Sequence, residues 1–185
     1  SYQCISQINT VLRDMNTLDF SSIGVSEEDK AAYFGELRVL RAWYYMFLLD
    51  FFRQVPIATE QQGAEEIVAQ SSAEDVYNFI ESEIKEVLPA LPKEKRLGRW
   101  TQGPAAGLLV RLYLNSEVWV GKDRYADCKQ WAEDIIAGKY GTYSITNLIT
   151  KIHSVLVSTT TNLPKIYLNS GMTVDVWNNR PCGLT

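Results

Sequence analysis

The chain has 185 residues, 46% of them hydrophobic and 22% charged, which is the composition of one ordinary globular domain and excludes a disordered or fibrous chain. Its 18 basic and 22 acidic residues give a formal net charge of -4, so the sequence lacks the basic excess typical of proteins that bind nucleic acid. The longest uninterrupted hydrophobic run, Ala42 to Leu49, is much shorter than the roughly 20 residues of a membrane-spanning helix.

Hydrophobic residues recur at helical spacing from the start of the chain and predict a first helix over about residues 2–16. A longer periodic run follows Ser26, which has Asp29 three residues later as in a capping box, and predicts a helix to about Phe52. Its C-terminal half is hydrophobic on both sides, so we expect it to be the central helix, with the aromatic residues at 43–45 in the core.

Three further helices are predicted downstream. Ser71 and Ser72 offer an N-cap for a helix that Pro89 and Pro92 end. Thr101 is expected to cap a helix that runs through Leu114. Within it, a glycine at position 107 costs about 1 kcal/mol relative to alanine, and we expect close helix packing to compensate for this. A last amphipathic helix opens at Asp123 and ends at Gly138.

The helices after about residue 73 are candidates for antiparallel hairpins of the tetratricopeptide (TPR) kind. Tyr125, Cys128 and Ile135 have the spacing of the second helix of such a unit. The first helix fits less well, because Tyr113 lies 15 residues before Cys128, so residues 116–124 would be an insertion. The pattern indicates an all-α, TPR-like fold of packed helical hairpins.

The sequence changes character after Tyr140. Residues 141–185 contain eight threonines and five asparagines, a single acidic residue, Asp175, and no helical periodicity. We therefore divide the chain into a helical domain, residues 1–140, and an irregular tail, residues 141–185, in which a strand over residues 149–157 is possible.

No catalytic residue, metal site or cofactor site is predicted. His153 is the only histidine, so a histidine-based metal cluster or a Ser-His-Asp triad would depend on one residue of the tail. The three cysteines, at positions 4, 128 and 182, are too widely spaced for a disulfide framework or a zinc site. Gly98 and Gly103 flank Trp100 without the spacing of a phosphate-binding loop.

Paired carboxylates could support glycoside hydrolysis, but the acidic residues here lie on the polar sides of amphipathic helices, where we expect them to be solvated. These acidic residues include Glu74, Asp75, Glu81, Glu83, Glu133 and Asp134. Among the aromatic residues, Trp100 and Trp119 lie at loop or helix-end positions and are the candidates for contact with a ligand.

The segment from Gly35 to Tyr45, followed by Val55-Pro56-Ile57, resembles the SusD/RagB family of nutrient-binding lipoproteins of Bacteroidetes-type outer membranes. Other blocks agree with the family in order and spacing: Ile8-Asn9, the helix from Ser72 to Pro92, Gly98-Arg99 through to Asn115, and Arg124-Tyr125 through to Tyr140. The resemblance covers about residues 2–140.

The sequence departs from the family pattern in three places. Arg53 follows Phe52 where the family usually has glycine, so Arg53 must adopt a conformation that glycine reaches more easily. Gly107 replaces a usual alanine. The family's continuation after Tyr140 is missing, and a full-length member is over twice as long, so we expect a truncated chain whose tail is either non-native in reading frame or an unusual variant.

The resemblance implies a SusD-like α-α superhelix and a non-enzymatic protein that binds glycans. Such a protein would be lipid-anchored at the cell surface, on the outer membrane, and would pass oligosaccharides to a SusC-like TonB-dependent transporter. The signal peptide and the lipid anchor would lie outside this chain, and no ligand-contacting residue can be transferred from the family. The alternatives are a TPR-like scaffold for protein–protein interaction and, less favoured, a helical glycoside hydrolase.

Overall fold

The computed structural model describes residues 2–62, 68–94, 96–143, 165–167 and 173–175. The helices and strands are α1 (Tyr2–Thr17), the 3-10 helix η1 (Ser21–Ile23), α2 (Glu27–Phe52), α3 (Ala73–Val87), the 3-10 helix η2 (Leu88–Ala90), α4 (Gln102–Leu114), α5 (Ser116–Val120), α6 (Tyr125–Ile136), β1 (Lys165–Tyr167) and β2 (Thr173–Asp175). Residue contacts divide the chain into two units, Ser1–Thr142 and Tyr143–Thr185.

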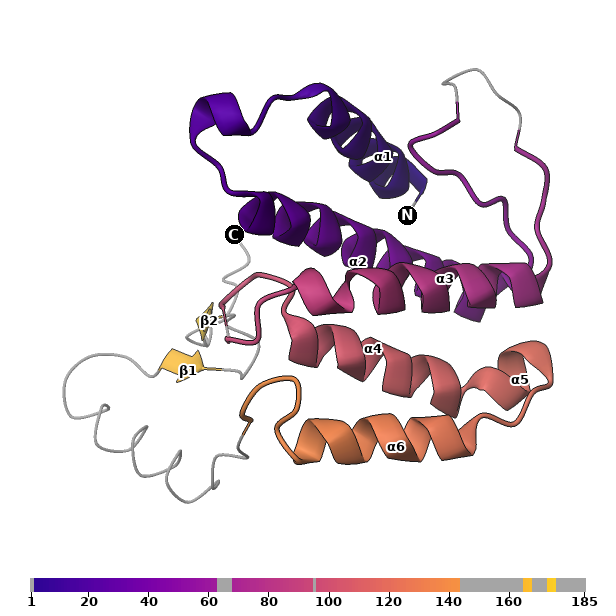
Figure 1. The fold of residues 1–185 in the computed structure, drawn as a ribbon. Helices are drawn as coiled ribbons and strands as arrows, with labels where there is room; N and C mark the ends of the chain where they lie inside the picture. Colours follow the sequence, from indigo (N-terminus) through magenta and orange to yellow (C-terminus); the bar gives the residue numbers. More distant parts are fainter. Residues whose placement is uncertain (1, 63–67, 95, 144–164, 168–172, 176–185) are drawn as a thin grey trace, which may run out of the picture. The chain divides into compact units, whose positions relative to one another are not determined.

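In the first unit the long helices pack against one another in chain order: α1 on α2, α2 on α3, α3 on α4, and α4 on α6 (Figure 1). The pairs α2/α3 and α4/α6 form the two most extensive helix contacts and run as antiparallel hairpins. The prediction of an all-α fold of packed helical hairpins is therefore confirmed. The short helix α5 was not predicted, and it occupies the segment that breaks the TPR spacing.

The core lies between these helices and is centred on α2. Its fully buried side chains include Val39, Tyr45, Ile80, Leu109 and Tyr113. Trp43 and Tyr44, expected in the core with Tyr45, are half-buried and pack against it. At the end of the unit, the ring of Tyr140 stacks on Trp131 at a centroid distance of 5.4 Å.

Side-chain caps set the starts of α2 and α3. The Ser26 hydroxyl accepts a hydrogen bond from the Asp29 N–H at 3.0 Å, and Ser72 forms a complete capping box with Asp75. Thr101 stands at the N-cap position of α4, as predicted, but its side chain makes no cap hydrogen bond. The first turn of α4 is instead held by Gln102, whose side chain donates to the Leu91 carbonyl at 2.8 Å.

The expectation of close packing at Gly107 is also wrong. A Cβ built on Gly107 would meet no heavy atom within 4 Å beyond its own helix neighbourhood. The tightly packed glycine is Gly35 on α2, where a Cβ would lie 3.1 Å from Cδ2 of Leu91. The close approach of α2 to Leu91, which follows α3 and η2, therefore depends on the missing side chain of Gly35.

Arg53 has the unusual backbone conformation expected at a position where the resembled family usually has glycine. Its φ is 61° and its ψ is -65°, and it is the one non-glycine residue with positive φ in the described part of the chain. The Gln54 N–H donates to the Phe52 carbonyl at 2.7 Å across it, which makes a classic γ-turn, a rare and strained conformation. The Arg53 guanidinium folds back to donate to the Leu49 carbonyl at 2.7 Å and closes the end of α2.

The second unit contains the antiparallel pair β1 and β2, in which Ile166 is opposite Val174. The strand considered over residues 149–157, together with His153 and Cys182, lies outside the described residues. The boundary between a domain of residues 1–140 and a tail of residues 141–185 stays a prediction.

In the described residues, no helix combines the length and the hydrophobicity needed to cross a membrane.

Candidate functional site

The two tryptophans predicted as ligand contacts do not form a site together. Trp119 is only 6% exposed, and its indole N–H donates to Oδ1 of Asp50 at 3.1 Å. This prediction is corrected because α5 turns the Trp119 side chain into the core. Trp100 is half-buried, with its ring 6.4 Å from that of Trp43, and packs against the core.

The structure instead gathers polar groups around the segment that follows α2. The Tyr45 hydroxyl accepts a hydrogen bond from the Ala58 N–H at 2.8 Å, and Asn9 of α1 donates to the Ala58 carbonyl at 3.0 Å. Arg13 of α1 donates to the carbonyls of Glu60 and Gln62. These bonds fix the path of residues 58–62 against α1 and α2.

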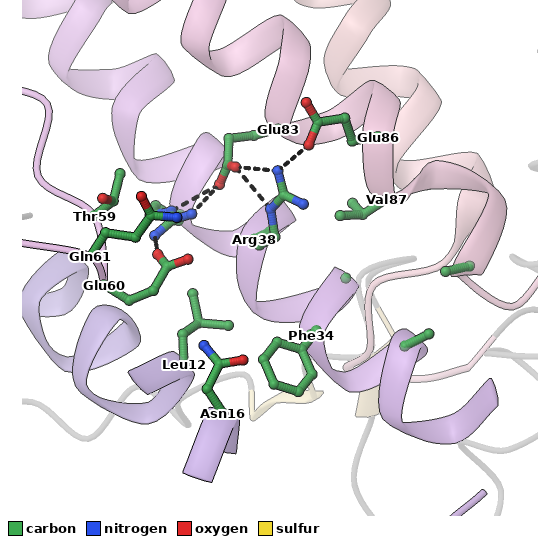
Figure 2. Close-up of a pocket in the computed structure, with 14 residues that line it drawn as sticks. Leu12, Asn16, Phe34, Arg38, Thr59, Glu60, Gln61, Glu83, Glu86 and Val87 are labelled. Atoms are coloured by element: carbon green, nitrogen blue, oxygen red, sulfur yellow. Dashed lines mark hydrogen bonds and ion pairs between the residues drawn. The ribbon is translucent and has the colours of Figure 1, made fainter. Parts of the chain in front are cut away.

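A buried ion-pair network lies beside this segment (Figure 2). Arg41, 2% exposed, donates through Nε and Nη2 to Oε2 of Glu83 at 2.8 and 2.6 Å, and through Nη1 to Asn9 and Glu60. Arg38 donates through Nε and Nη2 to Oε1 of Glu83 at 2.8 and 2.6 Å. One carboxylate from α3 therefore bridges two arginines of α2.

The network extends toward solvent through Glu86, whose Oε2 accepts from Nη2 of Arg38 at 2.6 Å. Burial by itself lowers the pKa of Arg38, but the hydrogen bonds that its guanidinium donates to Glu83 and Glu86 outweigh burial, and the pKa is raised. Burial likewise raises the pKa of Glu60, but the guanidinium of Arg41 outweighs it and holds that pKa below its usual value.

The expectation that Glu83 is solvated is wrong, since it is only 4% exposed. Glu83 can be buried as a carboxylate because Arg38 and Arg41 satisfy both of its oxygens. Glu81 is also partly covered, and it accepts from Tyr113, Lys85 and Arg124. Glu74, Asp75 and Glu133 are exposed as predicted, and Asp134 is partly buried.

The network was not predicted from the sequence, although two arginines in a largely hydrophobic helix pointed to buried ion pairs. Arg38 and Arg41 are three residues apart in α2, where its hydrophobic C-terminal half begins, so both lie on one side of the helix. Charged residues are almost never fully buried without a partner. The two arginines therefore need acidic partners, but the sequence does not show which of its many carboxylates pack against Arg38 and Arg41.

A cavity of about 540 Å³ opens next to the network. Leu12 and Asn16 of α1 line one side, with Phe34 of α2 and Glu60 beside them, while Glu83 and Glu86 of α3 lie across the opening (Figure 2). The full lining comprises Leu12, Asn16, Ala31, Phe34, Gly35, Arg38, Arg41, Thr59, Glu60, Gln61, Glu83, Glu86, Val87 and Ala90. Its volume is within the range of small-molecule sites.

The carboxylates of the cavity are poorly suited to acid–base catalysis. A general acid for glycoside hydrolysis needs a carboxyl group whose pKa is raised. Glu60 has the opposite shift, and Glu83 is bound by arginines on both of its oxygens. In the part of the chain that the structure describes, no group of three or more His, Cys, Asp or Glu residues could hold a metal ion.

Residues 1–114 match the SusD-like family described as "Starch-binding associating with outer membrane". The starch-binding protein SusD of Bacteroides thetaiotaomicron is 26% identical over 119 residues, or 63% of this chain and 21% of SusD. A SusD-like protein of Bacteroides ovatus is 27% identical over 120 residues, or 64% of this chain and 22% of the relative. The chain thus spans about a fifth of the length of the curated relatives it matches.

The fold agrees with a solved member of the family. A laminarin-binding SusD-like protein superposes with a TM-score of 0.60 at 27% identity, over 87% of this chain and 34% of that one. The matched region includes α1 to α4 and therefore the residues of the cavity. Since the family match covers well over half of the 185 residues, the chain belongs to the SusD-like family.

Proposed function

We propose that this chain is part of a non-catalytic glycan-binding protein of the outer membrane, which captures oligosaccharides and passes them to a SusC-like TonB-dependent transporter. The family match over residues 1–114 carries the proposal, because the family is described as starch-binding and associated with the outer membrane. The similarity to a laminarin-binding protein at 27% identity supports a glucan as ligand.

Binding without chemistry is supported by the cavity itself. Its carboxylates are held by arginines, and the pKa of Glu60 is lowered, whereas a general acid for hydrolysis needs a raised pKa. Attachment to the membrane would come from an N-terminal lipid anchor of the full-length protein.

Calorimetric titration of the 185-residue chain with maltoheptaose and laminarihexaose, together with an assay for newly released reducing ends, tests the proposal. We expect binding of at least one oligosaccharide without release of reducing ends. Release of reducing ends would make the protein a hydrolase. Binding of a peptide but of no sugar would favour the TPR-like scaffold instead.

The transport role needs a separate test. Outer-membrane fractions of the source organism should yield the full-length protein in a complex with a TonB-dependent transporter after detergent extraction. Recovery of the protein alone under conditions that keep other transporter complexes intact would argue against the transfer step.

A further inference from the structure

We infer that the cavity between α1, α2 and α3 binds a neutral hexose unit of the glycan and discriminates against acidic sugars. This inference rests on the proposed function and adds to it a site and a substrate class. It concerns the cavity lined by Phe34, Arg38, Glu60 and Glu86, for which the sequence offered no ligand contact.

The cavity has an apolar wall that a sugar ring can contact. Phe34 projects into it beside Leu12, as Figure 2 shows, and Val87 of α3 adds a third apolar side chain to the lining. The ring of Phe34 also packs against that of Phe20, at a centroid distance of 6.2 Å. The flat face of an aromatic ring at this position can pack against the C–H groups of a pyranose.

The cavity also supplies polar groups with free capacity. Glu60 and Glu86 each bind an arginine through Oε2, and their Oε1 atoms accept no hydrogen bond from the described residues. Nη1 of Arg38 likewise donates to none of them. The amides of Asn16 and Gln61 lie at the same opening. A hexose has an apolar face and many hydroxyl groups along its edge. The carboxylate oxygens, the guanidinium N–H groups and the amides around the apolar wall can form hydrogen bonds with those hydroxyls.

The balance of charge favours a neutral ligand. Three carboxylates, Glu60, Glu83 and Glu86, face two guanidiniums, Arg38 and Arg41, so the lining carries one excess negative charge. Both guanidiniums already bind carboxylates, as the ion pairs show. A uronate or a sulfated sugar would therefore meet an excess of carboxylate oxygens, with only Nη1 of Arg38, among the described residues of the lining, left to pair with.

The polar groups are also held in place before a ligand arrives. Arg41 and Glu83 are 2% and 4% exposed, and their mutual hydrogen bonds fix the position of Glu60 through Arg41. Groups that are already ordered lose little entropy when a ligand binds.

The test is calorimetry on the full 185-residue chain with maltoheptaose, laminarihexaose and oligogalacturonate. Phe34→Ala removes the apolar wall, and Gln61→Ala removes an exposed loop amide, so the second variant remains informative if the first does not fold. Tyr33→Ala is the matched control, because Tyr33 is an exposed aromatic residue on the same helix that does not line the cavity.

We expect Phe34→Ala to weaken binding of the neutral oligosaccharide by about tenfold or more, Gln61→Ala to weaken it several-fold, and Tyr33→Ala to leave it unchanged. Oligogalacturonate should bind at least about tenfold more weakly than the neutral glucans. Sugar binding that is unchanged in both cavity variants would overturn the inference and leave the proposed function standing. Preference for oligogalacturonate would overturn the substrate class, and a wild-type chain that binds no sugar would count against the proposed function itself.

Discussion

Replacing Arg53 by glycine and, separately, by alanine tests whether the turn after α2 stores strain. Arg53 lies in a classic γ-turn at φ 61° and ψ -65°. A non-glycine residue in such a conformation costs about 1–3 kcal/mol. Both variants lose the hydrogen bonds of the guanidinium to the end of α2, so the difference between them isolates the backbone.

The expected difference follows from two opposing contributions. Glycine relieves the strain, but its greater freedom in the unfolded chain costs about 0.5–1 kcal/mol relative to alanine. We therefore expect Arg53→Gly to be about 1 kcal/mol more stable than Arg53→Ala. For a chain of this size that corresponds to roughly 2–4 °C in Tm.

Urea unfolding followed by circular dichroism gives the two free energies. The same pair of substitutions at Gln54, an exposed residue whose φ is not positive, is the control, and there alanine should be the more stable. Equal stability of the two variants at position 53, or greater stability of the alanine variant, would show that the turn is not strained.

Three further outcomes follow from the packing and the ion pairs, each measured by urea unfolding. Gly107→Ala should stabilise the protein by up to about 1 kcal/mol, whereas Gly35→Ala should not, because its Cβ would lie 3.1 Å from a buried leucine. A gain at both positions would refute the packing at Gly35. Glu83→Gln should destabilise by about 3–5 kcal/mol, and Glu86→Gln, whose side chain is 61% exposed, by less than about 1 kcal/mol. Similar losses for the two variants would contradict the central role of Glu83. The pKa of Glu60 is lower in the folded protein than its unfolded value of about 4.3. Its stabilisation is therefore present above that value and is lost as the pH falls through the folded pKa. The wild type should lose more stability between about pH 7 and about pH 3 than Glu60→Gln does. Equal losses would argue against a stabilising ion pair between Glu60 and Arg41.

The sequence by itself determined most of the helical architecture. Hydrophobic periodicity and the caps at Ser26 and Ser72 placed α1, α2 and α3, because these signals depend on residues close together in the chain. The resemblance also anticipated the unusual backbone at Arg53, because a position usually occupied by glycine constrains φ whatever the fold around it.

Only the tertiary structure decided which polar residues are buried. Glu83 has the sequence environment of a solvated side chain, and it is buried because Arg38 and Arg41 of another helix face it. Trp119 has a helix-end position that makes it a candidate for contact with a ligand, but α5 turns its indole onto Asp50. The cavity is likewise formed by residues from α1, α2, α3 and the loop at 59–61, which are distant in sequence. Periodicity reports which side of one helix is apolar, whereas ion pairs and cavities depend on which helices meet and in what register.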